Sequence, residues 1–213
     1  MNRSRIKICG IKNIATINCC IKNRVSFFGL IFYNKSPRNI SLDNAKILLN
    51  YSKNKKILSV GVFVNKKIEI LNTILKDLKF DFIQLHGIEN NNYIKYIKKN
   101  NKVKIIKVIS TNSIKDLQKV SKYPDADVFL FDYKPNNNEL PGGNAKSFKW
   151  SLIKNINLKK PWFLSGGINI NNIKEINNFA IPYGIDISSG VEVKPGFKSN
   201  KKITDLINLY NAK

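Results

Sequence analysis

Two residues of the sequence have side chains suited to acid–base chemistry, and each stands at the end of a strand-like run. Cys9 follows Lys7 and Ile8, and Asp132 follows the apolar residues 128–131. A carboxyl group at the end of a buried run needs a partner or has a raised pKa, and an ionised thiol is a base. On one rim of a folded protein, these two groups could divide the roles of acid and base. The alternative for Cys9 is a small, buried, apolar residue.

Four more polar residues stand at or near the ends of apolar runs and are candidates for substrate binding. Arg38 is one of only four arginines and lies in a proline-containing loop, where its guanidinium could bind a carboxylate. Gln84 and His86 alternate along a strand-like run, so both could point into one cavity. Asp186 lies in the last such run, 184–187. The alternatives are a surface charge for Arg38 and, with equal weight, a structural histidine for His86.

Two glycine-rich segments predict an anion site. The first contains Gly166 and Gly167, and the second contains Ser188, Ser189 and Gly190. Backbone N–H groups in such turns, helped by the dipole of a following helix, bind phosphate. One turn alone would more simply be a tight loop that needs positive φ. Two of them at neighbouring strand ends favour a phosphorylated small-molecule substrate.

These residues are spaced by a repeating unit in which a β-branched or aromatic run precedes a stretch with helical periodicity. The expected strands are 7–9, 26–33, 57–64, 80–85, 104–109, 128–132, 162–165 and 184–187. The expected helices are 14–21, 41–50, 67–78, 92–99, 113–122, 147–153, 171–178 and 201–210.

Consecutive apolar residues in several of these strands indicate burial on both faces, which is typical of a parallel sheet covered by helices. Eight units of about 27 residues each are close to the smallest size of a strand–helix unit. We therefore predict an α/β fold, a single-domain (β/α)8 TIM barrel over residues 1–213, in preference to an open doubly wound sheet. Such barrels have their active sites at the carboxyl ends of the strands.

The formal charge of +23 is large, but its composition argues against specific nucleic-acid binding. The chain has 33 lysines and 4 arginines, and 31 asparagines and 32 isoleucines accompany them. Proteins that read nucleic acids rely on arginine, whereas codons rich in A and T specify lysine, asparagine and isoleucine together. We therefore interpret the lysines as solvated surface residues and predict no specific nucleic-acid partner.

The cysteines and the apolar runs suggest where the protein works. There are three cysteines, Cys9, Cys19 and Cys20. Their odd number disfavours a disulfide scaffold, and their spacing is not that of zinc ligands. Roles in packing or catalysis stay open for them. No apolar run approaches the ~20 residues of a membrane-spanning helix, and no signal-peptide pattern follows the N-terminus. We expect a cytoplasmic protein without membrane attachment.

Six motifs, in order, resemble those of phosphoribosylanthranilate isomerase of tryptophan biosynthesis, and they span nearly the whole chain. The family consists of (β/α)8 barrel enzymes without a cofactor or metal. The matching segments are 7–11 (Lys-Ile-Cys-Gly-Ile), 61–65 (Gly-Val-Phe-Val-Asn), 83–87 (Ile-Gln-Leu-His-Gly), 164–168 (Leu-Ser-Gly-Gly-Ile), 184–192 and 195–196 (Pro-Gly).

The resemblance implies an Amadori rearrangement of N-(5-phosphoribosyl)anthranilate to 1-(2-carboxyphenylamino)-1-deoxyribulose 5-phosphate. It makes Cys9, as a thiolate, the general base and Asp132 the general acid. A thiol can serve as a base near neutral pH where nearby positive charge lowers its pKa, and the sequence leaves the pKa of Cys9 open. Arg38 would hold the anthranilate or orient the substrate. Gln84, His86 and Asp186 would bind the substrate. The phosphate would be held by backbone amides of the two glycine-rich segments, at Gly166, Gly167, Ser188, Ser189 and Gly190.

The chain departs from the family in the loop after Asp132. Ala145 replaces a usual glycine, which would hinder loop closure if the backbone there needs positive φ. An asparagine run at 136–138 lengthens the same loop. The rival functions are another sugar-phosphate isomerase or epimerase, and a degenerate barrel that binds nucleic acid or a protein partner. The single histidine disfavours a metal-dependent epimerase, and the oligomeric state stays open.

Overall fold

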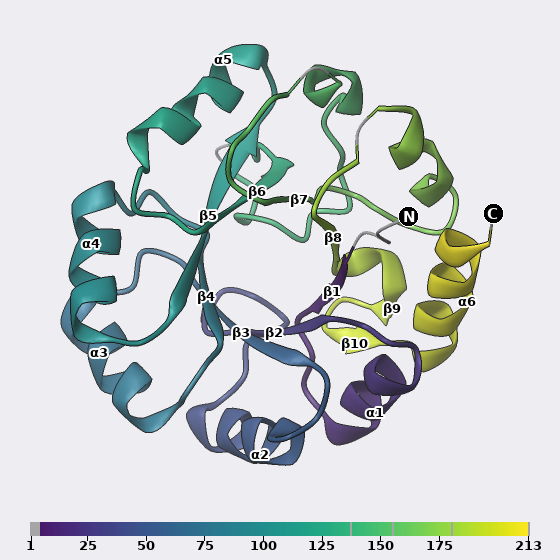
Figure 1. Cartoon of the computed structure of the whole chain (residues 1–213). Coiled ribbons are helices and arrows are strands. Elements are labelled where there is room, and N and C mark those ends of the chain that lie inside the picture. The colour runs from purple at the N-terminus through teal and green to yellow at the C-terminus, as the bar shows by residue number, and fades with distance from the viewer. Residues whose placement is uncertain (1–4, 137, 155, 180, 213) are drawn as a thin grey trace.

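Eight parallel strands form a closed barrel in sequence order, from β1 to β8, in the computed structural model (Figure 1). The structure describes residues 5–136, 138–154, 156–179 and 181–212, so Asn137 of the asparagine run and the ends of the predicted range 1–213 lie outside it. The strands are β1 Arg5–Cys9, β2 Phe27–Ile31, β3 Leu58–Phe63, β4 Phe82–Leu85, β5 Lys104–Thr111, β6 Val128–Tyr133, β7 Trp162–Leu164 and β8 Gly184–Ile187.

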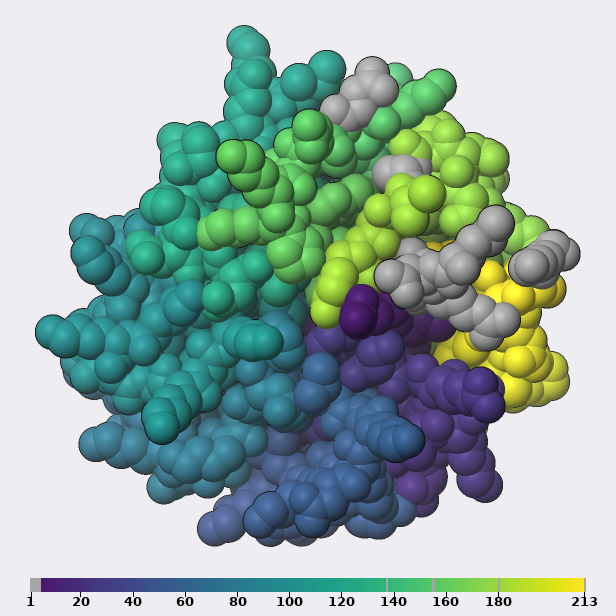
Figure 2. All heavy atoms as spheres, viewed as in Figure 1, coloured from purple at the N-terminus to yellow at the C-terminus, as the bar shows by residue number. Residues whose placement is uncertain are grey.

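Closure of the barrel confirms the predicted fold and excludes the open sheet. β1 pairs with β8 in parallel, with Lys7 opposite Asp186 and Ile8 opposite Ile187. The first and last thirds of the chain therefore lie side by side, as the adjoining purple and yellow-green atoms of Figure 2 show.

The helices surround the barrel (Figure 1). They are α1 Ile14–Lys22, α2 Leu42–Ser52, α3 Ile68–Asp77, α4 Asn91–Asn100, the short α5 Ile114–Leu117 and α6 Asn200–Asn211. Local sequence sets their starts. The side chain of Ser41 accepts a hydrogen bond from the backbone N–H of Asn44 at 3.3 Å, which caps α2 as its sequence predicts.

The helices predicted at 113–122, 147–153 and 171–178 are wrong in length or type. The first is one α-turn continued by the 3₁₀ turn Gln118–Lys122, and the others are the 3₁₀ turns Trp150–Ile153 and Ile173–Asn178. The buried residues of the last two turns are three positions apart, which suits three residues per turn. A hairpin of β9 Glu192–Lys194 and β10 Phe197–Lys198, which the periodicity did not predict, precedes α6.

Apolar side chains fill the barrel interior, and Cys9 lies at the end of the interior that the carboxyl ends of the strands form. Phe27 packs edge-on against Phe82 and Phe163, with ring centroids 5.5 and 5.3 Å apart. A second and larger core lies between the barrel and the surrounding helices. None of the helices in the described part of the chain has the length and apolarity needed to cross a membrane.

The interpretation of all lysines as solvated residues is wrong for three of them. Lys7, Lys107 and Lys198 are buried, and their ammonium groups form ion pairs of 2.9, 2.9 and 2.6 Å with Asp186, Glu89 and Glu192, respectively. A buried ammonium is tolerated only when a partner compensates its desolvation.

Candidate active site

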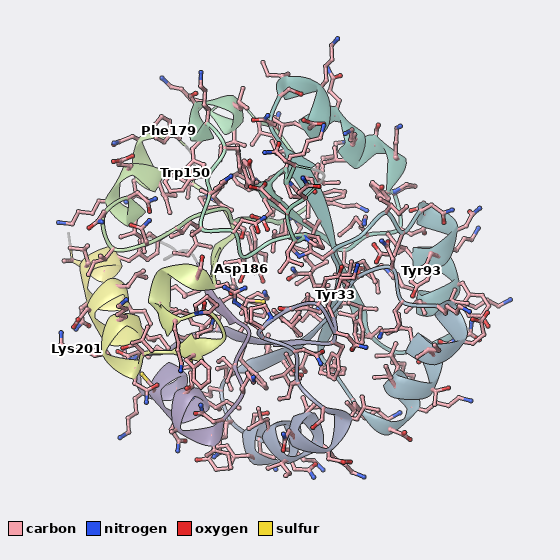
Figure 3. The ribbon with its side chains drawn as sticks, turned by 180° about the vertical axis from the view of Figure 1, so that it is seen from behind. Tyr33, Tyr93, Trp150, Phe179, Asp186 and Lys201 are labelled. Carbon is pink, nitrogen blue, oxygen red and sulfur yellow. The ribbon has the colours of Figure 1, made fainter. Side chains whose placement is uncertain are left out.

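A cavity of about 530 Å³ opens at the carboxyl ends of the strands and brings together the six polar residues singled out above. Asp186 and Tyr33, which both line it, lie near the middle of the ring in Figure 3, whereas Trp150 and Lys201 lie among the surrounding helices. The lining is Cys9, Ile31, Tyr33, Ser36, Arg38, Val62, Val64, Gln84, His86, Asp132, Leu140, Pro141, Gly142, Gly143, Ser165, Asp186 and Ser188.

A smaller cavity of about 330 Å³ adjoins the first and shares Asp132 and Asp186 with it. Four of the five residues predicted to bind phosphate line this smaller cavity: Gly166, Gly167, Ser188 and Ser189. Gly190 is not among its lining residues. A Cβ atom at Gly190 would lie 2.0 Å from the carbonyl oxygen of Ile168, so this glycine allows the two loops to approach closely.

Cys9 is the last residue of β1, and the neighbouring strand makes room for its thiol. A Cβ atom at Gly29 of β2 would lie 2.8 Å from Sγ, so a larger residue there would displace the sulfur. Burial raises the pKa of Cys9, and the positive charges of Lys7 and Lys198 offset this effect only in part. Desolvation therefore outweighs the nearby cations, and the pKa of Cys9, which the sequence leaves open, lies above its usual value.

Asp132 is buried near the end of β6 and is the end of a short chain of polar groups. Its Oδ1 accepts a hydrogen bond of 2.8 Å from the backbone N–H of Tyr133, and its Oδ2 is 3.3 Å from Nε2 of His86. The amide nitrogen of Gln84 is 3.1 Å from Nδ1 of the same imidazole. His86 thus faces the cavity and the carboxyl group of Asp132 instead of packing within the core, and Gly142 crosses above both.

Arg38 is buried, so the surface-charge alternative is wrong. Its Nε and Nη2 atoms donate hydrogen bonds of 2.9 and 2.8 Å to the two carboxylate oxygens of Glu192. Lys198 contacts the same carboxylate at 2.6 Å and also donates to the carbonyl oxygen of Ser188 at 3.0 Å. Burial opposes ionisation of Glu192, but Arg38 and Lys198 outweigh it and hold the pKa of Glu192 below its usual value.

Sequence reasoning missed Glu192 and Lys198 as parts of this site. Glu192 closes the fifth matching motif, and Lys198 follows the Pro-Gly pair, yet neither ends a predicted strand. Only the hairpin of β9 and β10 brings both residues beside Arg38, which is 154 positions from Glu192 in sequence. The signal available was an acidic residue and a lysine within a glycine-rich segment, which is too common to interpret alone.

The loop between β6 and β7 covers both cavities, and Ala145 in it has a strained backbone. Its φ is +56°, in the left-handed region that favours glycine. The nearby Gly142 and Gly143 also have positive φ, at +88° and +74°. We expect Ala145→Gly to raise the free energy of unfolding by about 0.5–1 kcal/mol, because relief of strain exceeds the added entropy of the unfolded chain. Urea unfolding measures this change.

The control for this prediction is Ala15→Gly, in the first turn of α1. Ala15 is exposed and has helical geometry, so glycine should lower the free energy of unfolding there by about 0.5–1 kcal/mol. If both substitutions destabilise the protein equally, Ala145 is not strained.

Comparisons with known proteins agree with this geometry. Residues 6–209 match the family model described as N-(5'phosphoribosyl)anthranilate (PRA) isomerase. The chain belongs to this family. It is 39% identical over 208 residues to N-(5'-phosphoribosyl)anthranilate isomerase of Rhizobium johnstonii, covering 97% of this chain and 93% of the relative. It is 40% identical over 205 residues to the isomerase of Rhizobium etli, covering 95% and 92%.

Solved structures of phosphoribosylanthranilate isomerases have the same fold. The enzyme from Thermotoga maritima superimposes with a TM-score of 0.87 at 29% identity, covering 97% of this chain and 98% of that one. Another, at 27% identity and a TM-score of 0.82, is in complex with reduced 1-(o-carboxyphenylamino)-1-deoxyribulose 5-phosphate. The protein is thus an isomerase of the family that serves tryptophan biosynthesis, which confirms the resemblance and the enzyme class predicted from the motifs.

Proposed function

We propose that this chain is one catalytic domain that converts N-(5'-phosphoribosyl)anthranilate to 1-(2-carboxyphenylamino)-1-deoxyribulose 5-phosphate. The observation that carries the proposal is the meeting of Cys9 from β1 and Asp132 from β6 in one cavity, with a second cavity lined by glycine-rich loops beside it. The bound product analogue of a solved family member supports this assignment.

Asp132 acts first, as the general acid. Its carboxyl proton goes to the ring oxygen of the ribose while the bond between that oxygen and C1′ breaks. The electron pair of the anthranilate nitrogen forms the C1′=N bond of a protonated Schiff base. The proximity of His86, at 3.3 Å, supports this role because the imidazole can exchange a proton with the carboxyl group between turnovers.

Cys9 acts second, as the general base. Its thiolate takes the proton from C2′, the electrons of that C–H bond form a C1′=C2′ double bond, and the nitrogen regains its electron pair. The resulting enolamine takes up a proton at C1′ while its C2′ hydroxyl loses one, and the product is the ketone. The raised pKa of the thiol leaves a small ionised fraction at neutral pH, so kcat should rise with pH through the alkaline range.

Arg38 and the apolar wall of the cavity suit the anthranilate group. Ile31, Val62 and Leu140 offer apolar contacts to the aromatic ring. Because Nε and Nη2 of Arg38 bind Glu192, we assign its remaining nitrogen, Nη1, to the carboxylate of the substrate. Glu192 then fixes the orientation of the guanidinium, as a buried bidentate ion pair can.

The smaller cavity suits the phosphate, and Gly167 tests this assignment. Gly167 has φ +66°, and a Cβ atom there would lie 2.9 Å from the backbone carbon of Lys146. We expect Gly167→Ala to raise KM about tenfold or more, since the loops that hold the phosphate must separate, with a smaller effect on kcat. Steady-state kinetics measures both constants, and an unchanged KM contradicts the phosphate assignment. Gly61→Ala, on β3, is the control for a general effect of adding a methyl group in the barrel.

Growth of a bacterial strain that lacks its own phosphoribosylanthranilate isomerase tests the function in a cell. Expression of this chain should restore growth without tryptophan, and expression of the Asp132→Asn variant at an equal level should not. Failure of the unaltered chain to restore growth, when the soluble protein is present, contradicts the proposal. The cytoplasmic location stays a prediction.

A further inference from the structure

Lys7 is a buried charged residue that the proposed reaction leaves without a role. It has no exposed surface, and it is absent from the lining of both cavities, so it does not touch the substrate. Its ammonium donates a hydrogen bond of 2.9 Å to Oδ1 of Asp186 on the neighbouring strand. Apolar residues of similar volume would fill such a position without the cost of desolvating two charges, so the pair calls for an explanation other than stability.

The position of Lys7 relates it to Cys9. Both residues are on β1, two positions apart, so their side chains point to the same face of the strand, and their Cα atoms are roughly 7 Å apart. That face is the barrel interior, where Cys9 belongs to the inner apolar cluster. An ammonium group has three N–H donors, and the hydrogen bond to Asp186 uses one of them.

We propose that Lys7 is a positioning residue for the base: its buried ammonium stabilises the thiolate of Cys9, and Asp186 holds that ammonium beneath the cavity. This inference rests on the proposed role of Cys9. It gives the buried ion pair a function in the reaction, and it explains how a thiol in an apolar interior ionises at all.

The charges around Cys9 come from several elements and act in opposite directions. Lys7 on β1 and Lys198 on β10 favour the thiolate, whereas Asp186 on β8 disfavours it. Arg38 and Glu192, which are paired with each other, and Asp132 with His86 complete the charged groups at this end of the barrel. Lys198 forms its ion pair with Glu192. Among the described residues, Lys7 is the one cation that forms an ion pair with Asp186. Lys7 and Asp186 should therefore affect Cys9 with opposite signs.

Alkylation of Cys9 by iodoacetamide measures its thiolate directly and does not depend on turnover. In the unaltered protein, trypsin releases Cys9 on the peptide 8–12, and it releases Cys19 and Cys20 together on 13–22, so mass spectrometry follows Cys9 separately. We expect Lys7→Met to slow alkylation of Cys9 at pH 7 about tenfold or more, because a buried cation that favours the thiolate is lost. Asp186→Asn should accelerate it. The rate for the peptide 13–22 should stay the same in both variants.

The double variant Lys7→Met/Asp186→Asn keeps the test decisive if a lone buried charge unfolds either single variant. It leaves no unpaired charge, and because Lys7 affects Cys9 more than Asp186 does, its Cys9 should still react more slowly than that of the unaltered protein. Its kcat should reach half of its maximum at a higher pH. If the ion pair is merely structural, both single variants should change the alkylation rate of Cys9 in the same direction, and Cys9 of the double variant should react as fast as in the unaltered protein. Either result overturns the proposal. Turnover by Cys9→Ala would instead refute the base itself.

Discussion

Replacement of Asp132 by asparagine is expected to lower kcat by about 10²–10⁴-fold, which is the usual contribution of a general acid. The amide has the same shape and can still accept the hydrogen bond from the N–H of Tyr133, so the backbone at the end of β6 should not move. What it lacks is a proton acidic enough to reach the ribose ring oxygen. Steady-state turnover measures the loss.

Asp205→Asn is the matched control for this prediction. Asp205 is in α6, with its side chain 40% exposed and paired with Lys201 on the surface, so the loss of its charge should leave kcat unchanged. Circular dichroism should give the same spectrum for both variants. A folded Asp132→Asn protein with full activity would show that another group protonates the ring oxygen.

Replacement of Cys9 by alanine is expected to reduce kcat to a similar extent, because no other side chain would take the proton from C2′. Alanine also removes the sulfur that Gly29 accommodates, so the substitution introduces no clash. The substrate should still bind, since Arg38 and the glycine-rich loops keep their places, and KM should change much less than kcat. Steady-state kinetics with saturating substrate separates the two constants.

Cys19→Ala tests whether the effect belongs to Cys9 in particular. Cys19 lies on α1, where its sulfur donates a hydrogen bond of 3.4 Å to the carbonyl oxygen of Asn200, and it does not line either cavity. It should retain full activity. Substantial turnover by Cys9→Ala would mean that the base lies elsewhere, and Asp186 would be the first residue to examine because it lines both cavities.

The strands and the identity of the proposed acid and base were predictable because each depends on local sequence. Consecutive apolar residues before Asp132 indicate a strand buried on both faces, and the end of a barrel strand is where function concentrates. The turns after β6 and β7 were not predictable as 3₁₀. Their apolar residues, such as Trp150 and Ile153, fit the spacing of an α-helix as well as that of a 3₁₀ turn.

The ion pairs of the site could not be predicted, because closure of the barrel creates them. Lys7 and Asp186 are 179 positions apart and meet only because β1 pairs with β8. Arg38 lines the cavity, but its carboxylate partner within the protein, Glu192, lies on a hairpin that has no periodic signature. The lysine-rich composition concealed Lys7 and Lys198, since nothing local distinguishes a buried lysine from the solvated ones.

Turnover of freshly prepared N-(5'-phosphoribosyl)anthranilate, followed as the loss of its fluorescence, shows whether the protein catalyses the rearrangement and whether Asp132 is its general acid. The unaltered protein, Asp132→Asn and Asp205→Asn should be assayed with one batch of substrate. We expect a rapid loss of fluorescence with the unaltered protein and the Asp205→Asn control, and almost none above the spontaneous rate with Asp132→Asn. No turnover by the folded, unaltered protein, or equal turnover by all three, would contradict this expectation.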